Sequence, residues 1–321
     1  MTPDFKHIDT NGISVRAAIV GAGPLVLLVH GWPESWHAWR HQMGPIAEAG
    51  FTACAIDVRG YGGSDKPHPV EAYAMREHIA DLVGVIDALS PGEPAILIGH
   101  DWGAPMVWYT AALHADHVRA VAGLSVPHVG IIEEEMVRLC DASKAAGTFF
   151  YQNYFEPEGV AEAEIEADTR SSLRRIYYAA SADGDFSRFM GEHPEDSVML
   201  DTVIDPDPFP AWWSEADIDY MTGEFERSGF RGPLNRYRNV RSDRDWLAGQ
   251  GDLTVRQPAL YLIGDADGVR FFVPDGDVLG HMKPYVPNLH APDFIPGVGH
   301  WTQQEKPELV TPLIVSWLKG L

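Results

Sequence analysis

Asp101 occupies the centre of the segment GHDWGA, between a short apolar run that predicts a buried strand and a stretch that is typical of a helix. A strand, a tight turn and a helix in this order often present a catalytic nucleophile, usually in the form G-x-S-x-G. Small residues surround the turn at Gly99, Gly103 and Ala104, and an aspartate that merely caps the following helix would not need them on both sides. The pattern therefore predicts a nucleophile at Asp101, with a carboxylate in place of the usual hydroxyl.

The choice of a carboxylate indicates the kind of carbon that this nucleophile would attack. A serine that attacked an alkyl carbon would form an ether, which an activated water molecule cannot readily hydrolyse. A carboxylate forms an ester with the same carbon, and water can then attack the carbonyl carbon of Asp101 itself. We therefore expect an alkyl electrophile, such as an epoxide or a haloalkane, in preference to an ester or an amide.

A histidine and a second acid follow Asp101 along the chain. His300 lies in the segment VGHW, after the last strand-like segment and before the last predicted helix. Asp265 and Asp267 follow the buried strand that the run LYLIG predicts. Nucleophile, acid and histidine occur in this order in α/β-hydrolases, and the acid of such a triad orients the histidine and stabilises its charged form. We expect Asp267 to be this acid, with Asp265 as the alternative.

Two main-chain N–H groups are candidates for an oxyanion hole, the site that binds a negatively charged oxygen. The loop HGWPESW follows the predicted strand LVLLV and can place the N–H of Trp32 opposite the turn at Asp101. The N–H of Trp102, directly after the nucleophile, would be the second donor. Because these donors belong to the main chain, both indole rings remain free to pack against a substrate or in the core.

The elements that must position these residues alternate between strands and helices. Strands are predicted at 13–20, 25–31, 51–58, 96–99, 119–127, 257–265 and 290–297, with helices at 36–49, 73–89 and 306–321. This alternation predicts an α/β fold in which helices flank a mostly parallel central sheet. The residues between 131 and 245 are instead helical, acidic and aromatic in pattern. We therefore expect an α/β-hydrolase core, made of residues 1–130 and 246–321, with an inserted helical cap domain at 131–245.

Charge and composition exclude several classes of function. The net charge of −22 would repel phosphate backbones, so nucleic acid is not an expected partner. The N-terminus lacks the apolar stretch of a signal peptide, and no apolar run approaches the roughly 20 residues that span a membrane. We expect a cytoplasmic protein without membrane contact. His37 and His41 lack the glutamate of a zinc motif, so neither a metal nor another cofactor is expected.

Several segments together carry a resemblance to a known family: HGWP, DVRGYGGSD, GHDWGA, YQNYFEPEGVAEAE, GFRGPLNRYRN, GDADG and GHWTQQEKP. Over nearly its whole length the chain resembles the soluble epoxide hydrolases of the α/β-hydrolase superfamily, which use an aspartate nucleophile. The resemblance implies that Asp101, Asp267 and His300 form the catalytic triad. It also implies that residues 130–245 form a helical lid and that Trp32–Pro33 is a cis peptide.

The resemblance further implies that two lid tyrosines, Tyr151 and Tyr237, bind the epoxide oxygen. Opening an epoxide creates an alkoxide, a poor leaving group that needs a strong hydrogen-bond donor, and phenol hydroxyls can supply one. Position alone does not distinguish this pair from nearby tyrosines, namely Tyr154, Tyr177, Tyr178 and Tyr220. Arg236 departs from the family's pattern, in which an aromatic residue is expected, and this leaves the detailed shape of the pocket open.

Two other functions remain as alternatives. A haloalkane dehalogenase would use the same aspartate on the same fold, but it holds the halide with N–H donors, and HGWP lacks the asparagine that often supplies one. A non-catalytic ligand-binding member of the superfamily would keep the sheet and the lid, yet the complete triad and both tyrosines argue against it. The leading prediction is an epoxide hydrolase that converts a small apolar epoxide to a vicinal diol, as a monomer or a homodimer.

Overall fold

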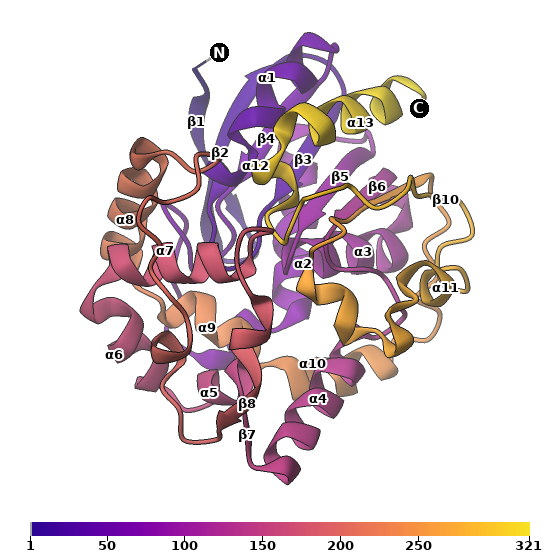
Figure 1. Ribbon diagram of the computed structural model, residues 1–321. Helices are drawn as coiled ribbons and strands as arrows, with labels where there is room; N and C mark the ends of the chain where they lie inside the picture. The colour runs from indigo at the N-terminus through magenta and orange to yellow at the C-terminus, as the bar shows by residue number, and fades with distance from the viewer. Residues whose placement is uncertain (1) are drawn as a thin grey trace.

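The computed structural model describes residues 2–321, which are built around a large eight-stranded sheet (Figure 1). The strands lie in the order β1-β2-β4-β3-β5-β6-β9-β10. The pairs β1–β2 and β2–β4 are antiparallel and the other neighbours are parallel, so the mostly parallel sheet is confirmed. The strands are β1 Asp4–Thr10, β2 Ile13–Gly21, β3 Leu25–Val29, β4 Thr52–Ile56, β5 Ala95–His100, β6 Val118–Leu124, β9 Ala259–Leu262 and β10 Leu289–His290.

Alternate side chains of the strands pack into two apolar layers, one on each face of the sheet. Leu27 and Leu97 belong to a layer that α2 and α3 cover, whereas Leu28 and Ile98 belong to the opposite layer under α1 and α13. The central strands are therefore apolar along their whole length, because both of their faces are buried. The covering helices are α1 Arg40–Glu48, α2 Met75–Leu89, α3 Gly103–Leu113 and α13 Pro307–Lys319.

The two edges of the sheet differ from the prediction. The N-terminal strand β1 was not expected, because its sequence is polar, and only two of its seven residues are buried at this edge. At the other edge the predicted strand 290–297 is wrong: pairing is limited to β10 and an isolated bridge between Gly264 and Ile295. Pro292 and Pro296 interrupt this segment, and proline has no N–H group to donate to a neighbouring strand.

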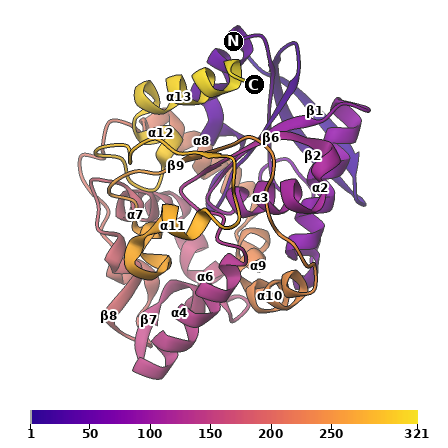
Figure 2. The same cartoon turned by 90° about the vertical axis from the view of Figure 1, so that its right-hand side faces the viewer.

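Most of residues 132–248 gather at the end of the sheet that is away from both chain termini (Figures 1 and 2). The segment is mainly helical, as expected, but it also contains a small sheet of two strands, β7 Thr148–Phe150 and β8 Met190–Pro194. Its α-helices are α4 Ile132–Ala146, α5 Tyr151–Phe155, α6 Val160–Ala167, α7 Thr169–Ala180, α8 Glu215–Ser228, α9 Arg231–Arg238 and α10 Val240–Ala248. Shorter helices elsewhere in the chain include η1 Trp36–Trp39, η2 Val70–Tyr73, η6 Gly268–Phe272, α11 Val278–Met282 and α12 Thr302–Glu305.

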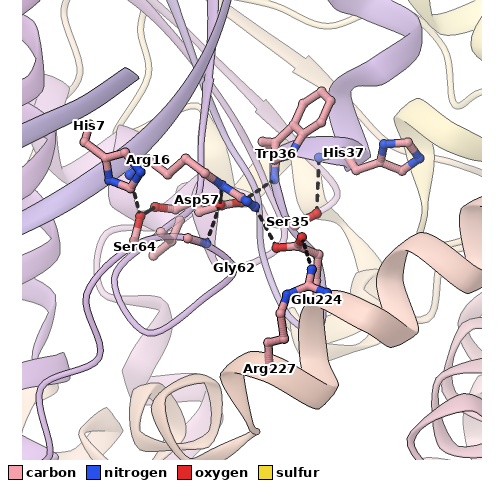
Figure 3. Close-up of polar contacts among 12 residues, drawn as sticks. His7, Arg16, Ser35, Trp36, His37, Asp57, Gly62, Ser64, Glu224 and Arg227 are labelled. Atoms are coloured by element: carbon pink, nitrogen blue, oxygen red, sulfur yellow. Dashed lines mark hydrogen bonds and ion pairs between the residues drawn. The ribbon is translucent and has the colours of Figure 1, made fainter. Parts of the chain in front are cut away.

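Charged side chains attach helix α8 of this segment to the core (Figure 3). Arg16 of β2 pairs with Asp57, which follows β4, and its Nη2 lies 2.6 Å from a carboxylate oxygen of Glu224 on α8. Two turns earlier on α8, a carboxylate oxygen of Asp217 lies 2.7 Å from the Nε2 of His37 in η1. The helix is therefore held to two separate elements of the core by ionic and hydrogen-bonding contacts.

Asp217 should make the stability of this attachment depend on pH. Burial disfavours its carboxylate, but hydrogen bonds from His37 and Ser214 and the charge of Arg40 hold its pKa well below the ordinary value. Because the folded pKa lies below the unfolded one, the stabilisation is complete above the unfolded pKa of about 4 and is lost as the pH falls below it. We expect Asp217→Asn to lower the free energy of unfolding at pH 7 by about 1–2 kcal/mol, and by progressively less below about pH 4.

Denaturant titrations at several pH values measure this difference. Asp219 lies on the same helix but is exposed and pairs with Arg170 at the surface, so Asp219→Asn should cost about 0.5 kcal/mol or less. Equal losses for the two variants, or a deficit for Asp217→Asn that does not change with pH, would contradict the role of Asp217.

Candidate active site

Asp101 lies in the tight turn between β5 and α3, with a positive φ of 49°. This conformation is uncommon for a residue with a side chain and turns the carboxylate away from the strand. A Cβ atom on Gly99 would lie 2.2 Å from the carbonyl oxygen of Gly103, and one on Gly103 would lie 2.1 Å from that of Val29. The small residues flanking Asp101 are therefore required by close backbone contacts.

The two carboxylate oxygens of Asp101 have different surroundings. Oδ1 accepts a hydrogen bond of 2.7 Å from the main-chain N–H of Trp32, whereas Oδ2 lies 3.3 Å from Nε2 of His300. Gly31 makes room for this arrangement, because a Cβ there would lie 2.3 Å from Oδ1. The Trp32–Pro33 peptide bond is cis, as expected. The second predicted donor, the N–H of Trp102, stays a prediction.

His300 lies in the loop between β10 and α12 and has an acidic group on each side. Its Nδ1 is 3.4 Å from Oδ1 of the fully buried Asp267 and 3.0 Å from the hydroxyl of Ser125. The alternative acid, Asp265, instead accepts a hydrogen bond from the N–H of Gly297, so its carboxylate is occupied elsewhere. Of the two acids, Asp267 is thus the one that the structure brings to His300.

Ser125 is a neighbour of His300 that the sequence analysis missed. It follows β6 with a positive φ of 68°, and its carbonyl accepts a hydrogen bond from the hydroxyl of Tyr261. Its position after the strand next to β5 could have suggested it, because the carboxyl ends of neighbouring parallel strands meet at one edge of a sheet. A single serine in such a place is a weak signal on its own.

The charges of the site support one another. Burial opposes charge on His300, but the carboxylates of Asp267 and Asp101 raise its pKa well above the ordinary value. Burial also disfavours the Asp101 carboxylate, yet the hydrogen bond and charge of His300 hold the pKa of Asp101 below its usual range. At neutral pH, Asp101 is therefore an ionised carboxylate beside a positively charged imidazole.

Tyr151 and Tyr237 lie opposite Asp101, at the start of α5 and near the end of α9. Their ring centroids are 5.9 Å apart, and both line the same cavities as Asp101. Burial raises the pKa of each phenol, so both keep their protons at neutral pH. The structure therefore brings two hydroxyl donors from the helical segment to the predicted nucleophile.

The competing tyrosines line neither of these cavities. Tyr177 is stacked between Trp213 and Trp301, and its hydroxyl donates to the carbonyl of Pro33. Tyr220 accepts a hydrogen bond from the indole of Trp36 at the attachment of α8. The remaining two, Tyr154 and Tyr178, pack against other aromatic residues.

Two cavities meet at Asp101, Tyr151, Tyr237 and Val269, with about 390 Å³ and 360 Å³ of empty space. Apart from these shared residues, the walls are largely apolar or aromatic. The first cavity is also lined by Trp32, Ile176, Ala180, Phe186, Phe189, His300 and Trp301, and the second by Trp102, Pro105, Val126, Ile132, Met136, Gln152 and Phe272.

Arg236, the departure from the family pattern, lines neither cavity. It is 1% exposed, and its guanidinium lies 4.5 Å from the ring centroid of Trp102 and 2.5 Å from a carboxylate oxygen of Asp243. Its Nη1 also donates a hydrogen bond to the carbonyl of Tyr73. The arginine thus supports the back of the Trp102 indole, and the cavity walls keep their apolar character.

Three further observations concern residues 2–321 as a whole. None of the helices in this range is both long and apolar enough to cross a membrane. Over the same range, no three His, Cys, Asp or Glu side chains are grouped so that they could hold a metal ion. Both cysteines, Cys54 and Cys140, are free and buried.

Comparison with known proteins agrees with this architecture. Residues 24–307 match the family model of the alpha/beta hydrolase fold. The chain is 38% identical to Epoxide hydrolase A of Mycobacterium tuberculosis, over 99% of this chain and 98% of that protein. It is 34% identical to Epoxide hydrolase 2 of Siraitia grosvenorii, over 98% of both chains. The crystal structure of Epoxide Hydrolase A from Mycobacterium thermoresistibile superimposes with a TM-score of 0.91 at 37% identity, covering 100% of this chain and 99% of that one.

Full-length coverage at this level of identity defines the class of the protein. The chain belongs to the α/β-hydrolase family and, within it, to the epoxide hydrolases. A second solved structure, an epoxide hydrolase from an endophytic Streptomyces, is 40% identical with a TM-score of 0.90, over 99% of this chain and 96% of that one. The fold class predicted from the sequence is confirmed.

Proposed function

We propose that this enzyme hydrolyses epoxides to vicinal diols through a covalent ester on Asp101. One observation carries the proposal: Asp101 has one oxygen bound by the Trp32 N–H and the other beside His300, in cavities that Tyr151 and Tyr237 also line. The names of the relatives, which are epoxide hydrolases, support the same reaction.

The first step forms the ester and opens the ring. Oδ2 of Asp101 attacks an epoxide carbon, and the bond between that carbon and the ring oxygen breaks. Tyr151 and Tyr237 donate hydrogen bonds to the oxygen as its negative charge develops, and it becomes a hydroxyl by taking a proton from one of the phenols, which regains a proton from solvent. Asp101 is then a neutral ester, and its Oδ1 is the carbonyl oxygen beside the Trp32 N–H.

The second step regenerates Asp101. Ester formation removes one of the two negative charges that raise the pKa of His300, so the imidazole loses its proton more easily. Neutral His300 takes a proton from water, which attacks the carbonyl carbon of Asp101. The N–H of Trp32, with that of Trp102 as the proposed second donor, stabilises the tetrahedral oxyanion. The bond between the carbonyl carbon and the alkyl oxygen breaks, and the leaving alkoxide takes the hydroxyl proton of the intermediate and departs as the diol. Asp101 is then again a carboxylate beside a protonated His300. Asp267 keeps the imidazole oriented.

We further propose that residues 131–245 act as a cap over the core, because both tyrosines come from this segment. The apolar walls of the two cavities suit a small apolar epoxide and disfavour charged substrates. The paired phenols also favour an epoxide over a haloalkane, since a departing halide needs no proton. The reaction needs no metal, because His300 rather than a metal ion activates the water.

A single turnover in ¹⁸O-labelled water tests the covalent step. With enzyme in excess of epoxide, we expect the new oxygen of the first diol to come from Asp101 and to be unlabelled. The label should remain in the peptide that contains Asp101, where mass spectrometry can detect it. Asp265→Asn serves as the matched control and should give the same result, because the Asp265 carboxylate is bound to Gly297 and not to His300. Labelled diol in the first turnover would mean that water attacks the epoxide directly, and the ester mechanism would be wrong.

A further inference from the structure

Gln152, the residue after Tyr151 on α5, has a buried side chain that touches the proposed active site. It is 4% exposed, and its Nε2 lies 2.9 Å from the hydroxyl oxygen of Tyr151. Gln152 lines the second cavity together with Asp101, and it also lines an outer groove together with Cys140. Its carboxamide therefore stands between the cavity and the outside, in contact with one of the two phenols.

The surroundings of the carboxamide determine which end faces Tyr151. Sγ of Cys140 lies 4.0 Å from Oε1 of Gln152. Burial raises the pKa of this thiol to about 11, so it stays protonated and can act as a weak donor. A donor on this side favours the carboxamide oxygen there, which leaves the NH₂ group directed at Tyr151.

We propose that Gln152 is a positioning residue that donates a hydrogen bond to the Tyr151 oxygen and so leaves the phenol proton free for the epoxide oxygen. A phenol has one proton to donate, and an acceptor in the place of the amide would capture that proton. With a donor there, the phenol oxygen is an acceptor toward Gln152 and a donor toward the substrate. This inference rests on the proposed epoxide hydrolysis and adds a residue to it.

The substitution Gln152→Glu tests this directional role, because it exchanges the donor for a group whose character depends on pH. An ionised carboxylate can only accept, so it should capture the Tyr151 proton, whereas a protonated carboxyl can donate as the amide does. We expect ester formation to slow by roughly 10²-fold at high pH, as in Tyr151→Phe. The rate should recover as the pH falls through the pKa of the introduced carboxyl.

All rates are measured as the gain of mass by the intact protein, with a terminal aryl epoxide as the probe. The His300→Gln background is used so that the ester accumulates and His300 does not titrate. The other titratable or charged groups around the carboxamide are Asp101 and Tyr237 toward the cavities, and Cys140, Lys144, Glu156, Arg238 and Arg241 around the groove. These groups are unchanged between variants, so a pH step present only in Gln152→Glu belongs to the new carboxyl.

Asn153→Asp is the matched control, since it makes the same change on the same helix. The Asn153 amide donates to the carbonyl of Cys140 and not to a tyrosine, so this variant should show no new pH step. In a Tyr151→Phe background, Gln152→Glu should also lose its pH step, because the proton it would capture is absent. A step that persists there would overturn the proposal.

A second variant keeps the inference testable if Gln152→Glu does not fold. Gln152→Met removes the donor without adding a charge and should slow ester formation by several-fold at every pH. An unchanged rate in Gln152→Met, or a rate for Gln152→Glu that does not depend on pH, would overturn the role of Gln152. If the parent protein itself gains no mass from any epoxide, the proposed function fails instead, so the two failures are distinguishable.

Discussion

His300→Gln is expected to convert the enzyme into one that is alkylated once and then stops. Asp101 should still attack the epoxide, because its carboxylate and the two phenols are unchanged. Hydrolysis of the ester should slow by roughly 10²–10⁴-fold, since the water loses its general base. The intact protein should gain the mass of one epoxide, and a peptide map should locate the gain on Asp101.

A second buried histidine provides the control for this prediction. His128 is 2% exposed and bonded to the carbonyl of Leu253, and burial lowers its pKa to about 4. It touches neither Asp101 nor the cavities, so His128→Gln should turn over many equivalents of epoxide without a lasting mass gain. If His300→Gln turned over like the parent, His300 would have no part in the mechanism.

Removing both phenol hydroxyls is expected to have the largest effect on ester formation. Each hydroxyl stabilises the same developing alkoxide, so Tyr151→Phe or Tyr237→Phe alone leaves one donor in place. A single donor of this kind contributes about 2.7–4 kcal/mol, or roughly 10²–10³-fold in rate, and we expect the low end for each single change. The double variant should fall by roughly 10⁴-fold or more, because no donor then remains for the alkoxide. The rates are compared as mass gain in the His300→Gln background.

The ester-hydrolysis step should change much less in the double variant, since it depends on His300 and main-chain donors. The control is a double Tyr→Phe change at Tyr154 and Tyr220, which line neither cavity, and it should keep the parent rate of ester formation. A Tyr151, Tyr237 double variant that alkylates Asp101 at the parent rate would refute the assignment. It would also favour the dehalogenase alternative, in which the leaving group needs no acid.

Local patterns in the sequence were sufficient to predict the fold class. They were also sufficient to predict the order in which the nucleophile, the acid and the histidine occur along the chain. The strand, turn and helix around Asp101 could be predicted because the turn requires glycine at two positions. A Cβ atom on Gly99 would meet the backbone of Gly103, and one on Gly103 would meet the backbone of the neighbouring strand β3. The apolar runs of β3 and β5 predicted buried central strands, since both faces of such strands lose contact with water. The polar edge strand β1 carried no such signal, and at the other edge the pattern of residues 290–297 predicted a strand that prolines interrupt.

Only the tertiary structure could select among residues that are equivalent in the sequence. Asp265 and Asp267 are two positions apart, and the choice between them depends on which carboxylate the loop turns toward His300. Ser125 reaches the same imidazole from a different strand, across 175 positions of sequence.

The lid tyrosines and Arg236 are further residues whose roles only the tertiary structure could decide. Six tyrosines of this region look alike in sequence, and packing directs two of them to Asp101 while Tyr177 is stacked between tryptophans. The arginine at position 236 suggested that the pocket differs in shape from that of the family. In the structure its guanidinium pairs with Asp243 and lies against the ring of Trp102. Residue types and short-range sterics thus determined which chemistry the chain can perform. The direction of each side chain depends on contacts between distant segments, which exist only after the chain has folded.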